Sequence, residues 1–154
     1  MIHDAKAALN EVFGRKNQLR ALRVEMSRLE RCFDIPRDDL PGDFPIDGVE
    51  VGDGEISVSC YGKTLHATGR IVDIGGNFYG EYMFTANQSG QIHNVFSIYV
   101  NSDGDVLAGN DFDSSIGSVG NPSRILYQVA LHIALTLPRS SVFTPSAPGV
   151  FQVR

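Results

Sequence analysis

The sequence predicts an α+β domain with an N-terminal helical arm, a five-stranded antiparallel meander sheet and a C-terminal helix packed on one sheet face. Residues 1–33 place apolar side chains three and four positions apart. Residues 55–107 alternate apolar and polar side chains between glycine turns, and residues 122–137 return to helical spacing. A chain of 154 residues suits one globular domain and is too short for two well-cored ones.

The helical arm, residues 1–33, contains no proline and is rich in Ala, Leu, Arg, Glu and Lys. Its apolar residues form two stripes that differ in direction by about a quarter turn at ~100° per residue. The change falls between Gly14 and Asn17, so we expect a kink there or two helices in series. The stripes are Ile2, Ala5, Leu9 and Val12, then Leu19, Leu22, Met26, Leu29 and Phe33.

Residues 34–54 are predicted to be an acidic linker rich in Pro and Gly. Residues 34–55 hold eight acidic residues and one arginine, a charge of −7, whereas residues 1–32 hold seven basic and four acidic residues, a charge of +3. We expect the linker to lie near the basic helix or to be solvated. A helix face carrying Lys16, Arg20, Arg23 and Arg31 could touch nucleic acid, but the net charge of −5 disfavours such a partner.

The meander is predicted from its turns. Two-residue turns at Gly62-Lys63 and Gly75-Gly76 place apolar residues opposite each other. They also align Glu55, Arg70 and Glu81 in one row across three strands. A one-residue slip would move every apolar side chain to the other face, so this agreement favours the register.

The remaining strands of the meander follow from two further connections. A loop from Asn87 to Gln91 is followed by a strand with Ile92, Phe96, Ile98 and Val100 on its apolar face. The turn at Asp103-Gly104 then sets Val100 opposite Leu107.

The last segments are a helix and a tail. Asn121 and Pro122 are predicted as the N-cap and first residue of a helix that runs to Leu137 and is apolar nearly all round. Residues 55–137 thus form the sheet-plus-helix domain, and residues 138–154 an extended tail. The two helices carry more apolar surface than a single sheet can cover, which predicts a homodimer or larger assembly.

The sheet face opposite the C-terminal helix is predicted to bind a protein partner. Aromatic, Met and Arg residues are enriched at interface centres. We expect a non-catalytic acidic adaptor, inhibitor or sequestering factor that acts through this face or the helical arm; an ordinary solvated face is the alternative. The expected contact residues are Arg70, Tyr79, Glu81, Met83, Val95 and Tyr99.

A glycine-rich loop, residues 117–124, enters the C-terminal helix and defines an alternative function. Amides at a helix start bind phosphate or carboxylate groups, so the chain could be a small-anion or nucleotide binder, with or without catalysis. The loop lacks the Lys-Ser/Thr ending of a P-loop, and simple capping explains the same residues. The expected ligand-binding residues are Ser118, Gly120, Asn121, Ser123 and Arg124.

The order helix, strands, helix in a small acidic chain resembles type III secretion chaperones. The stretch from Val95 to Leu137, which runs strand, Asp-Gly turn, strand and helix, carries the resemblance. It implies a secretion-chaperone-like protein that holds a partner polypeptide. The family's helix within the sheet has no counterpart here.

No residue has the context of a catalytic nucleophile, since there is no Gly-x-Ser-x-Gly elbow and Cys32 and Cys60 fall at apolar positions. His66, Thr85 and His93 fall in one predicted row, but two strands separate the histidines by about 10 Å. We therefore expect no metal, no cofactor and no catalysis. Two reduced cysteines and the lack of a long apolar segment predict a cytoplasmic protein without membrane contact.

Overall fold

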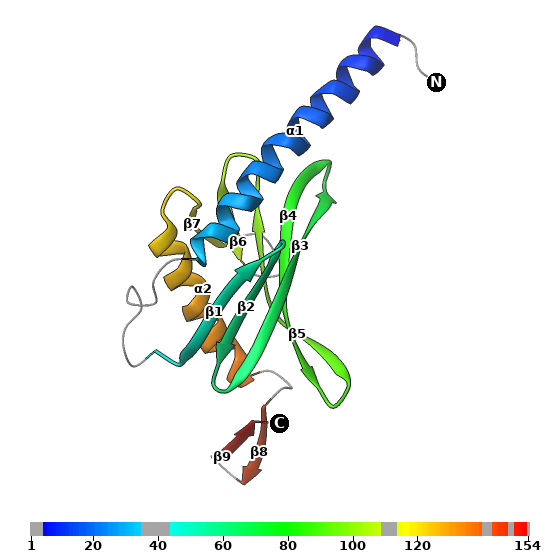
Figure 1. Cartoon of the computed structure of the whole chain (residues 1–154). Helices are drawn as coiled ribbons and strands as arrows, with labels where there is room; N and C mark the ends of the chain where they lie inside the picture. Colours follow the sequence, from blue (N-terminus) through cyan, green and yellow to red (C-terminus); the bar gives the residue numbers. More distant parts are fainter. Residues whose placement is uncertain (1–4, 35–43, 109–113, 140–142, 148–149, 154) are drawn as a thin grey trace.

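The computed structural model places two helices on one face of a seven-stranded antiparallel sheet (Figure 1). It describes residues 5–34, 44–108, 114–139, 143–147 and 150–153. The helices are α1 (Ala5–Cys32) and α2 (Pro122–Thr136), which the 3₁₀ turn η2 (Leu137–Arg139) follows. The strands are β1 (Ile46–Gly52), β2 (Glu55–Cys60), β3 (Lys63–Ile74), β4 (Asn77–Gln88), β5 (Gln91–Val100), β6 (Asp105–Ala108), β7 (Ser114–Ser118), β8 (Phe143–Ala147) and β9 (Val150–Val153).

The α+β class and the order of helix, antiparallel sheet and helix are confirmed, but the five-strand count is wrong. The predicted strands correspond to β2 through β6, and β1 and β7 add one strand at each edge. β1 lies in the segment predicted as a linker, where glycines and acidic residues hide the alternation of Val49 and Val51. β7 holds one buried large side chain, Ile116, which is too few to mark a period of two.

Helix α1 is one continuous element, so the break predicted between Gly14 and Asn17 is wrong. Only its second apolar stripe packs on the sheet, where Leu22, Met26 and Leu29 are buried. Of the first stripe, Ala5, Leu9 and Val12 are exposed, and Ile2 lies outside the described residues. The two stripes therefore have different surroundings along one continuous helix.

The β2–β3 turn differs from the predicted one without changing which face of the sheet is buried. The β2–β3 turn lies at Tyr61-Gly62, both with positive φ, instead of at Gly62-Lys63. The register consequently shifts by two residues, and Glu55 faces Thr68 instead of Arg70. The turn at Gly75-Gly76 and the pairing of Arg70 with Glu81 are confirmed.

A bulge in β5 alters the predicted register near its start. The β4–β5 turn is the two-residue Ser89-Gly90, and the pairing shifts between Phe84 and Thr85. The extra residue moves Ile92 away from the apolar face, and its side chain is 72% exposed. Beyond the next turn, Val100 pairs with Val106, so the predicted pairing with Leu107 is wrong by one residue.

The core lies between the sheet and the two helices. Tyr82, Phe84 and Ile98 project from the sheet toward Leu22 and Leu29 of α1, and α2 adds Ile125, Val129 and Ile133. Helix α2 begins at Pro122 as predicted, although the Asn121 side chain makes no capping hydrogen bond. β8 and β9 pair with each other in a separate two-stranded sheet.

Candidate functional site

Five of the six predicted contact residues share the sheet face opposite the helices. Arg70, Glu81 and Tyr99 pair across β3, β4 and β5, and Tyr79 and Met83 flank Glu81 on the same face of β4. Val95 instead lies at the β5 bulge and packs, half-buried, against the core. None of the six is among the large apolar side chains that are exposed in the described chain.

The centre of this face is an internally satisfied network. Arg70 Nε donates a hydrogen bond to Glu81 Oε1, and the Glu81 carboxylate is only 6% exposed. Tyr99 also hydrogen-bonds Glu81; burial first, and then this carboxylate, raise the pKa of Tyr99. A buried carboxylate with a guanidinium and a phenol beside it already has its partners, so this network supports the sheet more than it offers a binding site.

His66 lies close to a serine and a carboxylate without forming a catalytic triad. Ser57 Oγ is 2.9 Å from His66 Nδ1, and Glu55 Oε1 is 3.6 Å from the same nitrogen. A triad needs the acid and the nucleophile on opposite ring nitrogens, so no proton relay is available here. His66 faces Thr85 as predicted, but His93 pairs with Ala86 beyond the bulge, so the predicted row is wrong at His93.

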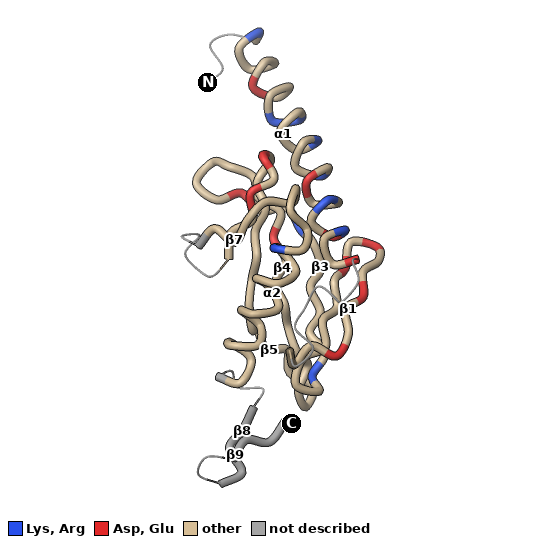
Figure 2. The backbone as a smooth tube through the Cα atoms, turned by 90° about the vertical axis from the view of Figure 1, so that its left-hand side faces the viewer, with Lys and Arg blue, Asp and Glu red and all other residues tan. Residues whose placement is uncertain are grey.

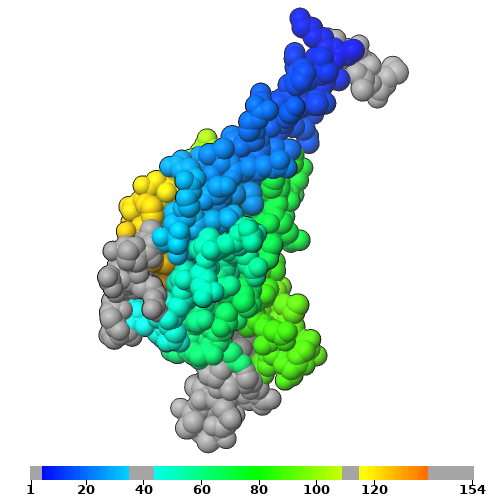
Figure 3. All heavy atoms as spheres, in the orientation of Figure 1, coloured from blue at the N-terminus to red at the C-terminus, as the bar shows by residue number. Residues whose placement is uncertain are grey.

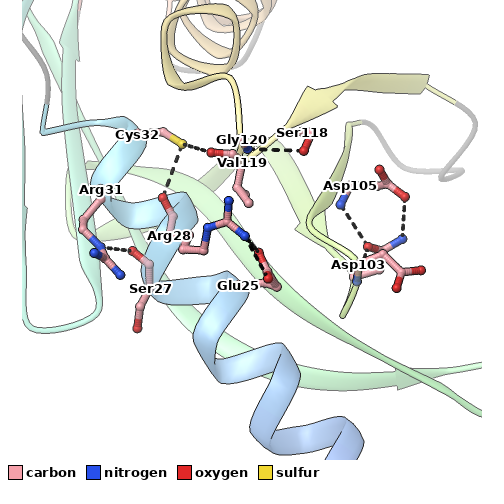
Figure 4. A network of polar contacts seen from close by, with 11 residues as sticks. Glu25, Ser27, Arg28, Arg31, Cys32, Asp103, Asp105, Ser118, Val119 and Gly120 are labelled. Atoms are coloured by element: carbon pink, nitrogen blue, oxygen red, sulfur yellow. Dashed lines mark hydrogen bonds and ion pairs between the residues drawn. The ribbon is translucent and has the colours of Figure 1, made fainter.

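The loop of residues 117–124 is held by its own hydrogen bonds (Figure 4). The Gly120 amide donates to Ser118 Oγ at 3.2 Å, and the Asn121 amide donates to the Ser118 carbonyl at 2.9 Å. The Val119 carbonyl lies 3.7 Å from the Cys32 thiol of α1. Ser123 and Arg124 are exposed at the helix start. Two of the amides expected for an anion are therefore already engaged.

The described residues offer neither a reactive thiol nor a cluster for a metal ion. Burial raises the pKa of Cys32 to about 11 and that of Cys60 to about 12, so both thiols stay protonated near neutral pH. No group of three His, Cys, Asp or Glu residues in this part of the chain could hold a metal. In the turn between β5 and β6, Asn101 Oδ1 accepts hydrogen bonds from the amides of Asp103 and Asp105, so these polar residues stabilise the turn.

Three exposed large apolar side chains lie close together in sequence on the N-terminal half of α1. Residues 5–21, here called the projecting half, contain no buried side chain. The N-terminal end of this segment extends beyond the sheet (Figure 3), whereas Arg15 lies over the ring of Phe78 in β4, 5.9 Å from its centroid. Leu9 is 54%, Val12 60% and Phe13 52% exposed. Phe13 was absent from both predicted stripes, but the divergence of the stripes was the signal that one of them faces away from the sheet.

The projecting half continues into a line of cations, here called the basic stripe: Lys16, Arg20, Arg23 and Arg31. Figure 2 shows basic residues along α1 and acidic residues gathered around β1. Lys16, Arg20 and Arg23 form no ion pair with any other described residue. Of the acidic linker predicted over residues 34–54, residues 35–43 lie outside the described residues, and Ile46–Gly52 form β1.

Two shallow hollows border the basic stripe. One, of about 590 Å³, is lined by Lys16, Leu19, Arg20, Arg23, Val24 and Ser27. The other, of about 470 Å³, lies between α1 and β3 and shares Arg23 and Ser27 with the first; it adds Met26, Glu30, Gly69, Arg70 and Ile71. The outward side of α1 is thus bordered by a groove that continues to the sheet.

Comparison with known proteins returned no matching family model, no matching curated protein and no matching solved structure. Among the described helices, none combines the length and apolar character that crossing a membrane requires.

Proposed function

We propose that the protein is a non-catalytic protein-binding module whose docking surface is the outward side of α1. The observation that carries the proposal is the exposure of Leu9, Val12 and Phe13 on a half-helix with no buried side chain. Apolar residues at this spacing form one side of an amphipathic helix, and burying them against a partner contributes about 25 cal/mol per Å².

The fixed base of the helix supports the same proposal. Leu22, Met26 and Leu29 anchor the second half of α1 in the core, and Glu30 accepts a hydrogen bond from Tyr82 of β4. A helix anchored at one end is already nucleated, so the rest of the helix extends from it without a new nucleus. A partner that binds the projecting half therefore meets a lower entropic cost than it would with an unfolded segment.

The experiment that tests this function places a photo-crosslinking amino acid at Val12 in the source cells, with the same residue at Ile92 as the control. Ile92 is more exposed but lies at the far β4–β5 turn. We expect a distinct crosslinked polypeptide at Val12 only. Purified partner should then bind V12E/F13E at least roughly tenfold more weakly than the parent chain. Identical products at both positions, or unchanged affinity of the variant, would contradict the proposal.

A further inference from the structure

We infer that the partner contributes an extended acidic segment, which adds as a strand to the open edge of β3 beside the basic stripe of α1. The inference rests on the proposed function, because it assigns a partner chemistry to the groove that adjoins the same helix. It draws on three independent observations: an unpaired sheet edge, an adjoining groove, and cations without described partners.

The open edge is the second half of β3. Strand β2 pairs with β3 from Lys63 to Thr68 only, whereas β4 pairs with β3 as far as Ile74. The last described contact on the β2 side is the Gly69 amide, which donates to the Gly54 carbonyl at 2.9 Å. Backbone groups alternate in direction along a strand, so the N–H and C=O of Ile71 and Asp73 point to the same open side as the Gly69 amide.

A groove between α1 and β3 lies beside this edge. The 470 Å³ hollow has Gly69 and Ile71 on one side and Met26 and Ser27 of α1 on the other. It joins the 590 Å³ hollow through Arg23 and Ser27. A strand placed at the edge of β3 would direct every second side chain toward α1.

The cations follow one another along α1 at intervals somewhat shorter than those between alternate residues of an extended chain. Lys16, Arg20 and Arg23 are separated by about 6 and about 4.5 Å along the helix axis, at ~1.5 Å per residue. Alternate residues of a strand are about 6.7 Å apart. Acidic side chains at every second position would therefore face successive cations, and the residues between them would lie on the opposite face of the sheet, beside Arg70 and Val72.

The charges that border this groove sum to a small positive value. Glu30 lies in it and Asp73 at its end, where they accept hydrogen bonds from the Tyr82 hydroxyl and the Gly76 amide, so two carboxylates stand against the cations. Arg70 is paired with Glu81. Lys16, Arg20 and Arg23 outnumber the two carboxylates, and an acidic peptide complements these three cations.

Two other occupants fit less well. A second copy of the chain, paired edge to edge through β3, would bring two basic stripes together, and like charges oppose that contact. Nucleic acid would use the cations but would leave the backbone groups of Ile71 and Asp73 without partners.

The test uses the full chain and a synthetic peptide of about ten residues that alternates Glu and Val, a length suited to one strand. We expect binding to slow amide exchange at Ile71 and Asp73. Affinity should fall at least roughly tenfold in R20E/R23E, and also for a peptide N-methylated at the residues that face β3. The control K63E/R124E carries the same charge change away from the groove and should bind as the parent does.

Four results would overturn the inference. The first is the absence of peptide binding at millimolar concentration, and the second is equal binding of a peptide in which Lys replaces each Glu. The other two are equal binding of the N-methylated peptide and tighter binding of a short DNA duplex to the basic stripe. Protection of Ile71 that rises with protein concentration alone would assign the edge to a second copy. The crosslink at Val12 does not depend on this edge, so these failures leave the proposed function standing.

Discussion

Tyr82 and Glu30 join the centre of the sheet to helix α1. The Tyr82 hydroxyl donates a hydrogen bond to Glu30 Oε2 at 2.5 Å and lies 3.3 Å from the Met26 carbonyl oxygen. Burial, and then the Glu30 carboxylate, raise the pKa of Tyr82 far above its ordinary value. This contact sets where the helix leaves the sheet, and hence where the projecting half stands.

Replacing Tyr82 by Phe removes the hydroxyl and keeps the ring. The Glu30 carboxylate then loses a buried donor, so we expect Y82F to lower the free energy of unfolding by about 1–3 kcal/mol in urea titrations. Y127F is the control, because Tyr127 is partly exposed and its ring packs on Phe44. Equal effects of the two substitutions would show that the Tyr82 hydrogen bond does not hold α1.

Gly80 makes room for Met26 of α1. A Cβ at Gly80 would lie 2.5 Å from Met26 Cγ and 3.0 Å from Val100 Cγ1. We expect G80A to destabilise the chain by about 1–3 kcal/mol, whereas G48A, whose Cβ would meet nothing within 4 Å, should change stability little. Combining G80A with M26A should cost less than the sum of the single changes, as measured by a double-mutant cycle. Additive costs would rule out the contact.

Arg70 neutralises a carboxylate that is nearly buried. Removing its guanidinium in R70A leaves Glu81 with Tyr99 as its remaining named partner, and we expect a loss of about 1 kcal/mol, limited because the Arg70 side chain is 66% exposed. Arg20 has no ion pair with a described residue, so R20A should change the urea midpoint by much less. A larger loss of stability in R20A than in R70A would contradict a stabilising role of the Arg70–Glu81 ion pair.

The buried thiols make stability depend on alkaline pH. In the unfolded chain Cys60 ionises near its ordinary value of 9.0, whereas burial raises its folded pKa to about 12. The folded state thus binds the proton more tightly, and this contribution is complete below pH 9 and is lost as pH rises toward 12.

Between pH 9 and pH 11, we expect the free energy of unfolding of C60A to fall by about 2 kcal/mol less than that of the parent chain. Urea unfolding at each pH measures this difference. V58A is the control, because Val58 is buried in the same strand and cannot ionise. It should lower stability at every pH while keeping the parent's pH slope. An unchanged slope in C60A would show that the thiol does not titrate as described.

The fold could be predicted where side chains alternate or recur regularly. The strands from Glu55 to Ala108 and the burial of Phe84, Phe96 and Ile98 followed from that alternation, because a slip by one residue would expose all three. The bulge at Val95 could not be predicted, since a single extra residue leaves the local pattern of apolar side chains intact. The sequence does not predict β1 and β7, because their own residues do not alternate clearly between apolar and polar. They are strands because they pair with β2 and β6.

The candidate site was less predictable than the fold. Five of the six predicted contact residues share one sheet face, but the burial of Glu81 and Tyr99 on it depends on their mutual contacts across strands, which no single-strand pattern reveals. The helical arm was predicted as a second candidate binding element, and the exposure of Phe13 on it depends on where the sheet ends beneath α1. The open edge of β3 depends on β2 being the shorter strand.

Amide hydrogen exchange of the isolated chain tests most directly whether the projecting half of α1 stands uncovered. We predict that residues 5–17 exchange at least roughly a hundredfold faster than residues 22–32, at rates independent of protein concentration, because only the second half is anchored by buried side chains. Equal protection of both halves would mean that the body of the protein already covers this surface. Protection that rises with concentration would mean that a second copy covers it, and either result would contradict the account.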